Sequence, residues 1–145
     1  MIKKYLTPSR IRIGLEAVNW KDLVDKVGNI LVQTDDIEPR YVDAMKKVIE
    51  DLGPYAVISP GVVLLHARPE DGVNRMCIAM ATLTKGINFG SVNDPVRLAI
   101  ALGANDHESH IEILRTLANF LEDKNRLKSL YSVRNAEEFI KVVVN

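Results

Sequence analysis

The stretch Ser59-Pro60-Gly61-Val62-Val63-Leu64-Leu65-His66 is the most informative part of the sequence for the fold. It begins with three residues that interrupt regular structure, continues with four consecutive apolar residues and ends at a histidine. A polar segment follows, Arg68-Pro69-Glu70-Asp71-Gly72, with the composition of a loop. A short apolar run between two such breaks is typical of a strand covered on both faces. The sequence therefore predicts a buried strand over residues 62–65 that carries His66 at its end.

Two further apolar runs and two amphipathic segments surround this strand. The run from Met76 to Leu83 predicts a second buried strand, and the run from Val96 to Ala104 fits either a strand or a helix. Apolar residues at helical spacing follow Asn19, which predicts a helix there. Another helix is expected to begin near Pro39 and to end at Gly53.

The last third of the chain has a helical pattern. Ser109 with Glu112 three residues later is a capping-box pattern, so a helix is expected to start there. A short helix around Leu127 and a terminal helix opened by Asn135 are expected to follow. Helices that alternate with buried strands indicate an α/β fold, a sheet with helices packed against it. Because no repeat or linker interrupts the pattern, one domain over residues 1–145 is expected.

The composition limits the classes of function. Of 145 residues, 47% are apolar and 26% are charged, and 19 basic residues balance 19 acidic ones. Such a neutral chain gives no sign of nucleic-acid binding or of a polybasic membrane surface. Cys77 is the only cysteine, which excludes an internal disulfide. No signal peptide and no apolar window of about 20 residues is found, so a cytoplasmic protein without membrane insertion is expected.

His66 is the first candidate for chemistry. Open α/β sheets place their ligands beyond strand ends, where an imidazole is held firmly and still reaches solvent. Histidine suits nucleophilic work because its neutral ring keeps one free lone pair. Arg68, two residues on, offers a guanidinium to phosphate oxygens. The alternative is a histidine that ends the strand and bonds a backbone carbonyl, and the spacing leaves both open.

His110 is the second candidate, in the first turn of the helix expected after Ser109. Free N–H groups and the helix dipole attract an anion there and hold an imidazole neutral. The alternative is a surface histidine at a helix end. His107 is expected in the preceding loop, with a solvated side chain.

Other chemistries have weaker support. A zinc site could be assembled from three imidazoles and one carboxylate, namely His66, His107, His110 and Asp106, but no H-x-x-x-H or C-x-x-C pair is present. Cys77 lies inside an apolar run and is expected in the core. The glycine patterns of nucleotide sites are absent, so no cofactor and no metal is expected. Asp35 and Asp36 are expected to be solvated at a helix start.

Several short motifs occur in a fixed order along the chain: Trp20, Tyr41-Val42-Asp43-Ala44-Met45, Gly53-Pro54-Tyr55, Ser59-Pro60-Gly61, His66-Ala67-Arg68-Pro69-Glu70-Asp71-Gly72-Val73, Asn88-Phe89-Gly90, Asn93-Asp94-Pro95-Val96, Asp106 and His110-Ile111-Glu112-Ile113-Leu114. In this order they resemble the enzyme IIA domains of the bacterial phosphoenolpyruvate-dependent sugar phosphotransferase system, mannitol–fructose superfamily. The motifs at Gly53 and His66 look most like the ascorbate-type branch. The resemblance covers nearly the whole chain.

The resemblance implies a mixed β-sheet flanked by helices and a phosphohistidine at His66, formed at Nε2. The phosphoryl group would come from the phosphocarrier protein HPr and pass to a cysteine of a IIB domain. From there it would reach a sugar that enters through a IIC membrane permease. His110 matches the family's second histidine, which bonds the phosphoryl group or steadies the acceptor ring. Four further residues are expected to support the site, Arg68, Asp106, Ser59 and Gly61, and a homodimer is compatible with the pattern.

Two departures from the mannitol-type pattern stand out. Val48 lies where those relatives carry an arginine, so Arg68 or N–H donors would have to supply the missing charge. Leu65 stands where they often have proline. Both differences fit the ascorbate-like branch, and neither fixes the sugar. The main alternative is a regulatory relative whose phosphorylation state controls the binding of partners.

Overall fold

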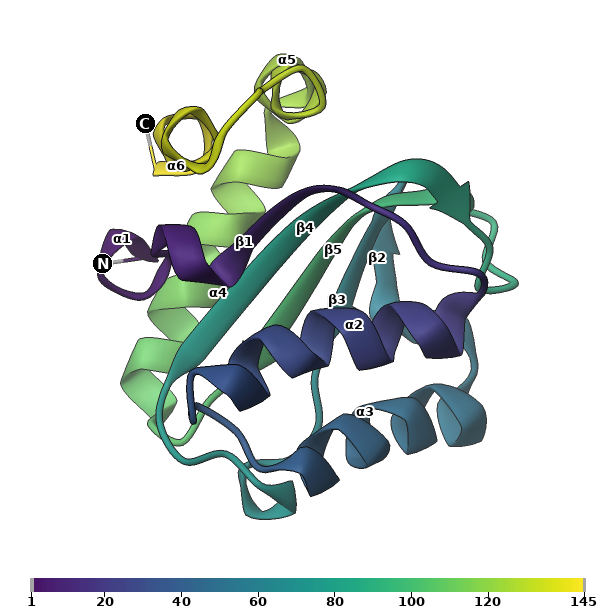
Figure 1. Ribbon diagram of the computed structural model, residues 1–145, viewed down its shortest axis with the longest axis vertical. Helices are drawn as coiled ribbons and strands as arrows, with labels where there is room; N and C mark the ends of the chain where they lie inside the picture. Colours follow the sequence, from purple (N-terminus) through teal and green to yellow (C-terminus); the bar gives the residue numbers. More distant parts are fainter. Residues whose placement is uncertain (1, 145) are drawn as a thin grey trace.

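The computed structural model describes residues 2–144, in which a five-stranded sheet is covered by helices on both faces (Figure 1). In chain order the elements are α1 (Ile2–Tyr5), the 3₁₀ turn η1 (Pro8–Arg10), β1 (Ile11–Leu15), α2 (Trp20–Gln33), α3 (Pro39–Leu52), η2 (Pro54–Ala56), β2 (Val57–Ser59), β3 (Val62–Leu65), η3 (Pro69–Asp71), β4 (Cys77–Ile87), β5 (Val96–Gly103), α4 (His107–Glu122), α5 (Lys124–Leu130) and α6 (Ala136–Val144).

The sheet has the strand order β1-β4-β5-β3-β2. Strand β1 runs parallel to β4 and β3 runs parallel to β5, whereas the pairs β4–β5 and β2–β3 are antiparallel. The predicted mixed α/β fold is therefore confirmed, and the run from Val96 is a strand. In the parallel pair Leu65 lies opposite Ala101, so β3 and β5 end at the same edge of the sheet.

The two faces of the sheet differ in side-chain size. In the middle of β4 and β5 the face toward α2 and α3 carries small side chains, those of Ala79, Ala81, Ala99 and Ala101. The opposite face, toward α1, α4, α5 and α6, carries large ones, those of Ile78, Met80, Leu98, Ile100 and Leu102. Successive residues of a strand point to opposite faces, which separates the two sets. The alanine face leaves room for large side chains from the helices, including Tyr41, which is fully buried.

Helices α2 and α3 lie side by side across the alanine face (Figure 1). The side chain of Asn19 caps α2 by accepting a hydrogen bond from the N–H of Asp22 at 2.9 Å. Gly53, with φ of +79°, ends α3 as predicted. Between the helices, a Cβ on Gly28 would lie 2.8 Å from a methyl carbon of Val42. The absence of a side chain at Gly28 therefore permits the close approach of the two helices.

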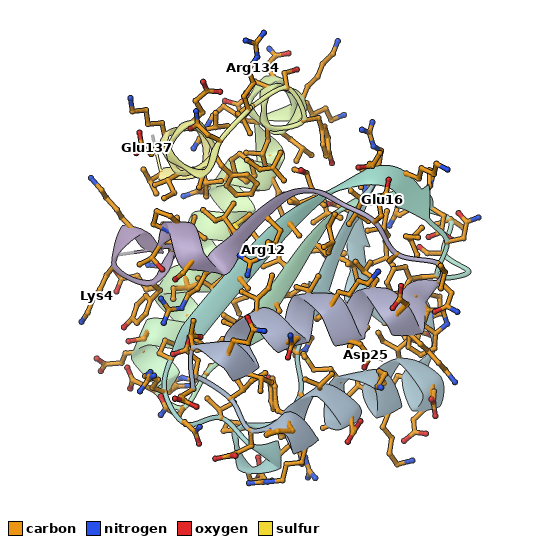
Figure 2. All side chains as sticks on the ribbon, viewed as in Figure 1. Lys4, Arg12, Glu16, Asp25, Arg134 and Glu137 are labelled. Carbon is orange, nitrogen blue, oxygen red and sulfur yellow. The ribbon has the colours of Figure 1, made fainter. Side chains whose placement is uncertain are left out.

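The C-terminal helices cover the other face. Asn135 Oδ1 accepts from the N–H of Glu138 at 2.9 Å, which confirms the predicted start of the terminal helix. The Arg126 guanidinium donates to the carbonyls of Val142 and Val143 and so fastens α5 to the end of α6. Figure 2 shows the charged side chains of Lys4, Arg134 and Glu137 pointing away from the body of the protein. Within residues 2–144 no helix has the length and apolarity to cross a bilayer.

The structure differs from the sequence predictions at several elements. The sequence pattern did not reveal α1 or the edge strand β1. Helix α4 begins at His107, not after Ser109, because Asp106 is its capping residue and accepts from the N–H of Ser109 at 3.1 Å. His107 is consequently the first residue of the helix and does not belong to a loop.

Candidate active site

The edge of the sheet where β3 and β5 end gathers most of the predicted site residues. His66 and Arg68 follow the last residue of β3 directly. Asp106 and His110 belong to the start of α4, which begins four residues after the end of β5. Since β3 and β5 are adjacent and parallel, both groups lie at one edge of the sheet.

The imidazole of His66 is exposed, and its orientation is fixed by the backbone. Its Nδ1 lies 3.1 Å from the carbonyl oxygen of Leu64. Because a carbonyl can only accept a hydrogen bond, this contact selects the tautomer with the proton on Nδ1. The lone pair then belongs to Nε2. Of the two alternatives left open by the sequence, the bond to a backbone carbonyl is observed, and the same bond leaves a lone pair on the other ring nitrogen.

Arg68 is exposed and pairs with an acidic neighbour. Its Nε lies 3.6 Å from Oδ2 of Asp71, and its N–H donates to the same carboxylate oxygen at 3.1 Å. Beside it, a hollow of about 320 Å³ lies between α3 and this loop. Its lining consists of Ala44, Lys47, Val48, Asp51, Leu52, Arg68 and Asp71. The position of the missing arginine, Val48, therefore faces a space that two cations, Lys47 and Arg68, already border.

Asp106 and His110 are joined through the first turn of α4. The Ser109 hydroxyl donates to Asp106 Oδ2 at 2.7 Å, and the N–H of His110 donates to the Asp106 carbonyl at 3.0 Å. The hydrogen bonds from the side chain and the backbone of Ser109 lower the pKa of Asp106, so that carboxyl stays ionised. The half-buried His110 occupies the end of this turn.

Ser59 and Gly61 do not belong to this edge. Ser59 pairs with Val62, the first residue of β3, and Gly61 receives hydrogen bonds from the N–H groups of Arg97 and Leu98 at the start of β5. The four-residue strand β3, about 13 Å long, separates them from His66. They shape the turn that starts the strand, and the structure does not bring them together with His66.

A residue of the site that the sequence pattern did not single out is Tyr41. Its hydroxyl accepts from the N–H of Ala67 at 2.9 Å and lies 2.7 Å from the carbonyl oxygen of Leu102. Burial raises its pKa to about 12. In the sequence Tyr41 looks like one more apolar position of α3. The signal that was available is general: a buried tyrosine has a hydroxyl that must find partners.

Cys77 lies in the core, as expected, at 1% exposure. Burial, together with the nearby charge of Asp36, raises the pKa of its thiol to about 12. We expect less than about a tenth of the protein to react with iodoacetamide at pH 8 in the time that modifies unfolded chains fully. Mass spectrometry with and without denaturant measures this difference. Equal labelling of the folded and unfolded protein would contradict the burial of the thiol.

The site shows no cluster suited to a metal. Within residues 2–144, no three histidine, cysteine or acidic side chains come together closely enough to hold an ion. The polar groups that the structure gathers at this edge are the imidazole of His66, the guanidinium of Arg68 and the start of α4. An exposed imidazole with a selected tautomer is suited to accept a group and release it again.

Comparison with known proteins agrees with a protein that accepts a group on an imidazole and releases it again. A model of the family described as "Phosphoenolpyruvate-dependent sugar phosphotransferase system, EIIA 2" matches residues 4–145. A relative from Salmonella typhi, named ascorbate-specific PTS system EIIA component, is 38% identical over 136 residues, which cover 92% of this chain and 88% of the relative. The chain belongs to this EIIA type 2 family, whose members are phosphotransferases and phosphocarriers with a phosphohistidine intermediate.

Solved structures share the fold over nearly the full length. The mannitol-specific cryptic phosphotransferase enzyme IIA from Escherichia coli has a TM-score of 0.87 at 27% identity and covers 99% of this chain and 97% of its own. Enzyme IIAMTL from Escherichia coli, in its complex with phosphorylated enzyme IIBMTL, has a TM-score of 0.82 at 26% identity, covering 95% and 96%. Nitrogen regulatory protein IIA-Ntr from Neisseria meningitidis has a TM-score of 0.85 at 26% identity and covers 98% of each chain.

Proposed function

We propose that His66 is the phosphoryl acceptor of this phosphocarrier and that Nε2 is the nucleophile. In the first step a bond forms between Nε2 and phosphorus while the bond to the histidine of phospho-HPr breaks. In the second step the cysteine thiolate of a IIB component takes the phosphoryl group and the bond to Nε2 breaks. The observation that carries the proposal is the contact of His66 Nδ1 with the Leu64 carbonyl, which leaves Nε2 with its lone pair on an exposed ring.

The neighbours of His66 have roles that follow from the charge of a phosphoryl group. The transition state of phosphoryl transfer spreads negative charge over three oxygens. Catalysis therefore depends on alignment and on nearby hydrogen-bond donors and cations. His110 lies at the same edge as His66 and is assigned to hold these oxygens or the ring. Arg68 supplies a cation that is exposed enough to turn from Asp71 toward a phosphoryl group.

The partners follow from the family and from one relative. The complex of enzyme IIAMTL with phosphorylated enzyme IIBMTL supports a IIB component as the acceptor. Family membership leads us to expect HPr as the donor, a IIC permease after the IIB component, and action in the cytoplasm. Ascorbate is the proposed substrate of the complete system, because the Salmonella typhi relative carries that specificity in its name.

The experiment that tests the proposal is a reconstituted relay. The protein is incubated with phosphoenolpyruvate, enzyme I and HPr, and acid-labile phosphate is mapped by mass spectrometry under neutral conditions. One phosphoryl group on His66, removed on addition of an ascorbate-type IIB component, is the expected result. Label that stays on another residue would overturn the assignment. Transfer to a mannitol-type but not an ascorbate-type IIB component would overturn the substrate alone.

A regulatory role is the second candidate, favoured by the likeness to nitrogen regulatory protein IIA-Ntr over 98% of both chains. In that case the charge on phosphorylated His66 would switch a binding surface. Pull-down from a lysate of the source cell with phosphorylated and unphosphorylated protein separates the two roles. Binding of a partner in one state only, without onward transfer to any IIB cysteine, would favour the regulator.

A further inference from the structure

The end of β3 is fastened to helix α3 by one buried phenol. We infer that Tyr41 is a positioning residue for phosphoryl transfer, which fixes the peptide between His66 and Ala67 and so aims Nε2. The inference rests on the proposed role of His66 and adds a residue that does not touch the phosphoryl group. Tyr41 comes from the first turn of α3 and is fully buried, with its hydroxyl at the edge of the sheet where β3 and β5 end.

The hydroxyl of Tyr41 has three backbone neighbours. It lies 2.9 Å from the nitrogen of Ala67, 2.7 Å from the oxygen of Leu102 and 3.2 Å from the oxygen of Ala67. A phenol has one proton to donate and lone pairs with which to accept. The N–H of Ala67 therefore donates to it, and its own proton goes to the nearer carbonyl, that of Leu102. In this way Tyr41 joins the segment after β3 to the end of β5.

These bonds act on His66 through the backbone. The N–H of Ala67 and the carbonyl of His66 belong to the same planar peptide, so holding the one holds the other. On the opposite side of the residue, the ring bonds the carbonyl of Leu64. The backbone is thus fixed after His66 by Tyr41, and the ring is fixed before it by Leu64. Together the two contacts leave the direction of Nε2 little freedom.

The loop that follows is held at other points by the start of α3. Arg40 donates to the carbonyl of Glu70 at 2.9 Å, and the N–H of Glu38 donates to the carbonyl of Gly72 at 2.8 Å. These contacts hold the far part of the loop, four and six residues beyond His66. Tyr41 is the anchor next to the imidazole, so its loss is expected to act on the ring most directly.

A Tyr41→Phe variant tests the inference, with Tyr131→Phe as the matched control. Tyr131 is partly buried, and its hydroxyl would lie 3.7 Å from a Cβ on Gly61, at the opposite end of β3. Single-turnover transfer from phospho-HPr is measured over a range of donor concentrations. We expect the saturating rate of Tyr41→Phe to fall by about tenfold or more, because small misalignment is costly in transfer reactions. The half-saturating donor concentration should change by less than about twofold, since the docking surface stays.

A spectroscopic readout separates aiming from a general loss of stability. In the ¹⁵N spectrum of the imidazole, wild-type His66 should show the tautomer with its proton on Nδ1, and Tyr41→Phe should show a mixture of tautomers. Tyr131→Phe should keep both the wild-type rate and the wild-type spectrum. An unchanged rate in Tyr41→Phe, or an equal fall in both variants, would overturn the positioning role.

Hydrogen exchange of the wild-type protein decides the question if Tyr41→Phe does not fold. The inference requires the Ala67 amide to be protected nearly as well as the strand amides, and exchange at the rate of an open loop would contradict it. The outcomes also separate this inference from the proposed function. Label on His66 with no effect of Tyr41→Phe removes the positioning role alone. Label on a residue other than His66 removes both.

Discussion

A His66→Ala variant is expected to take up no phosphoryl group from phospho-HPr. The transfer rate should fall by more than about 10³-fold, because the covalent intermediate has no atom on which to form. His66 is exposed, and within the described residues its ring makes one hydrogen bond to protein, with the Leu64 carbonyl. Its removal should therefore change the free energy of unfolding by no more than about 0.5 kcal/mol. Loss of labelling without loss of stability is the combined result that identifies an acceptor.

The matched control is His107→Ala, which removes another exposed imidazole from the same edge of the sheet. His107 is the first residue of α4, and its replacement should leave phosphoryl uptake within about twofold of wild type. A His110→Ala variant should lie between the two, because His110 is assigned to the oxygens or the ring and not to the new bond. Full labelling of His66→Ala, or equal losses in all three variants, would contradict the assignment.

The sequence predicted the buried strand that ends at His66 because the pattern of this strand is local. Residues 62–65 are buried on both faces, so they form an unbroken apolar run that marks its own end at His66. Strand β1 was missed because it is an edge strand, half exposed, in which Arg12 and Gly14 interrupt the pattern. The start of α4 was misplaced because two capping patterns overlap there, one from Asp106 to Ser109 and one from Ser109 to Glu112. Local pattern does not decide between them.

The parts of the site that depend on distant partners could not be read from the sequence. Tyr41 bonds Ala67 and Leu102, which are 26 and 61 residues away. Asp36 was expected to be solvated, yet it is 1% exposed. Its arginine partners, Arg10 and Arg75, are 26 and 39 residues away. Spacing along the chain carries no information on such pairings, whereas the sheet topology that creates them follows only from the whole fold.

Replacing Asp36 by asparagine should cost the protein about 2–4 kcal/mol of unfolding free energy at pH 7. The carboxylate accepts hydrogen bonds from Arg10 Nε at 2.7 Å, Arg75 Nε at 2.6 Å and the Thr34 hydroxyl at 2.7 Å. It thereby joins the chain before β1, the end of α2 and the chain before β4. Removal of one buried charge leaves its partners uncompensated, but the half-exposed Arg75 can turn to solvent, which keeps the loss moderate.

A surface ion pair provides the control for this variant. Lys46 Nζ lies 2.6 Å from Asp25 Oδ1, and the two side chains are 23% and 52% exposed. Asp25→Asn should change the unfolding free energy by less than about 1 kcal/mol, because solvent screens the pair. Urea unfolding of both variants and of the wild type gives the comparison. Equal stability of Asp36→Asn and wild type would show that the desolvation of the carboxylate cancels its bonds.

The stability that the Asp36 carboxylate contributes is expected to depend on pH. Burial of Asp36 acts to raise the pKa of its carboxyl, but the hydrogen bonds from Arg10, Thr34 and Arg75 outweigh it, and the pKa is lowered. The folded protein therefore binds this proton less readily than the unfolded chain, in which an aspartate titrates near about 3.9. The stabilising contribution is complete above that value and is lost as the pH falls through the lower folded pKa. The stability difference between wild type and Asp36→Asn should accordingly be constant from about pH 5 to 7 and shrink below about pH 4. A stability difference that grew with acidity would mean that the Asp36 carboxyl is held in its neutral form. The positive charges of Arg10 and Arg75 would then have no negative partner there.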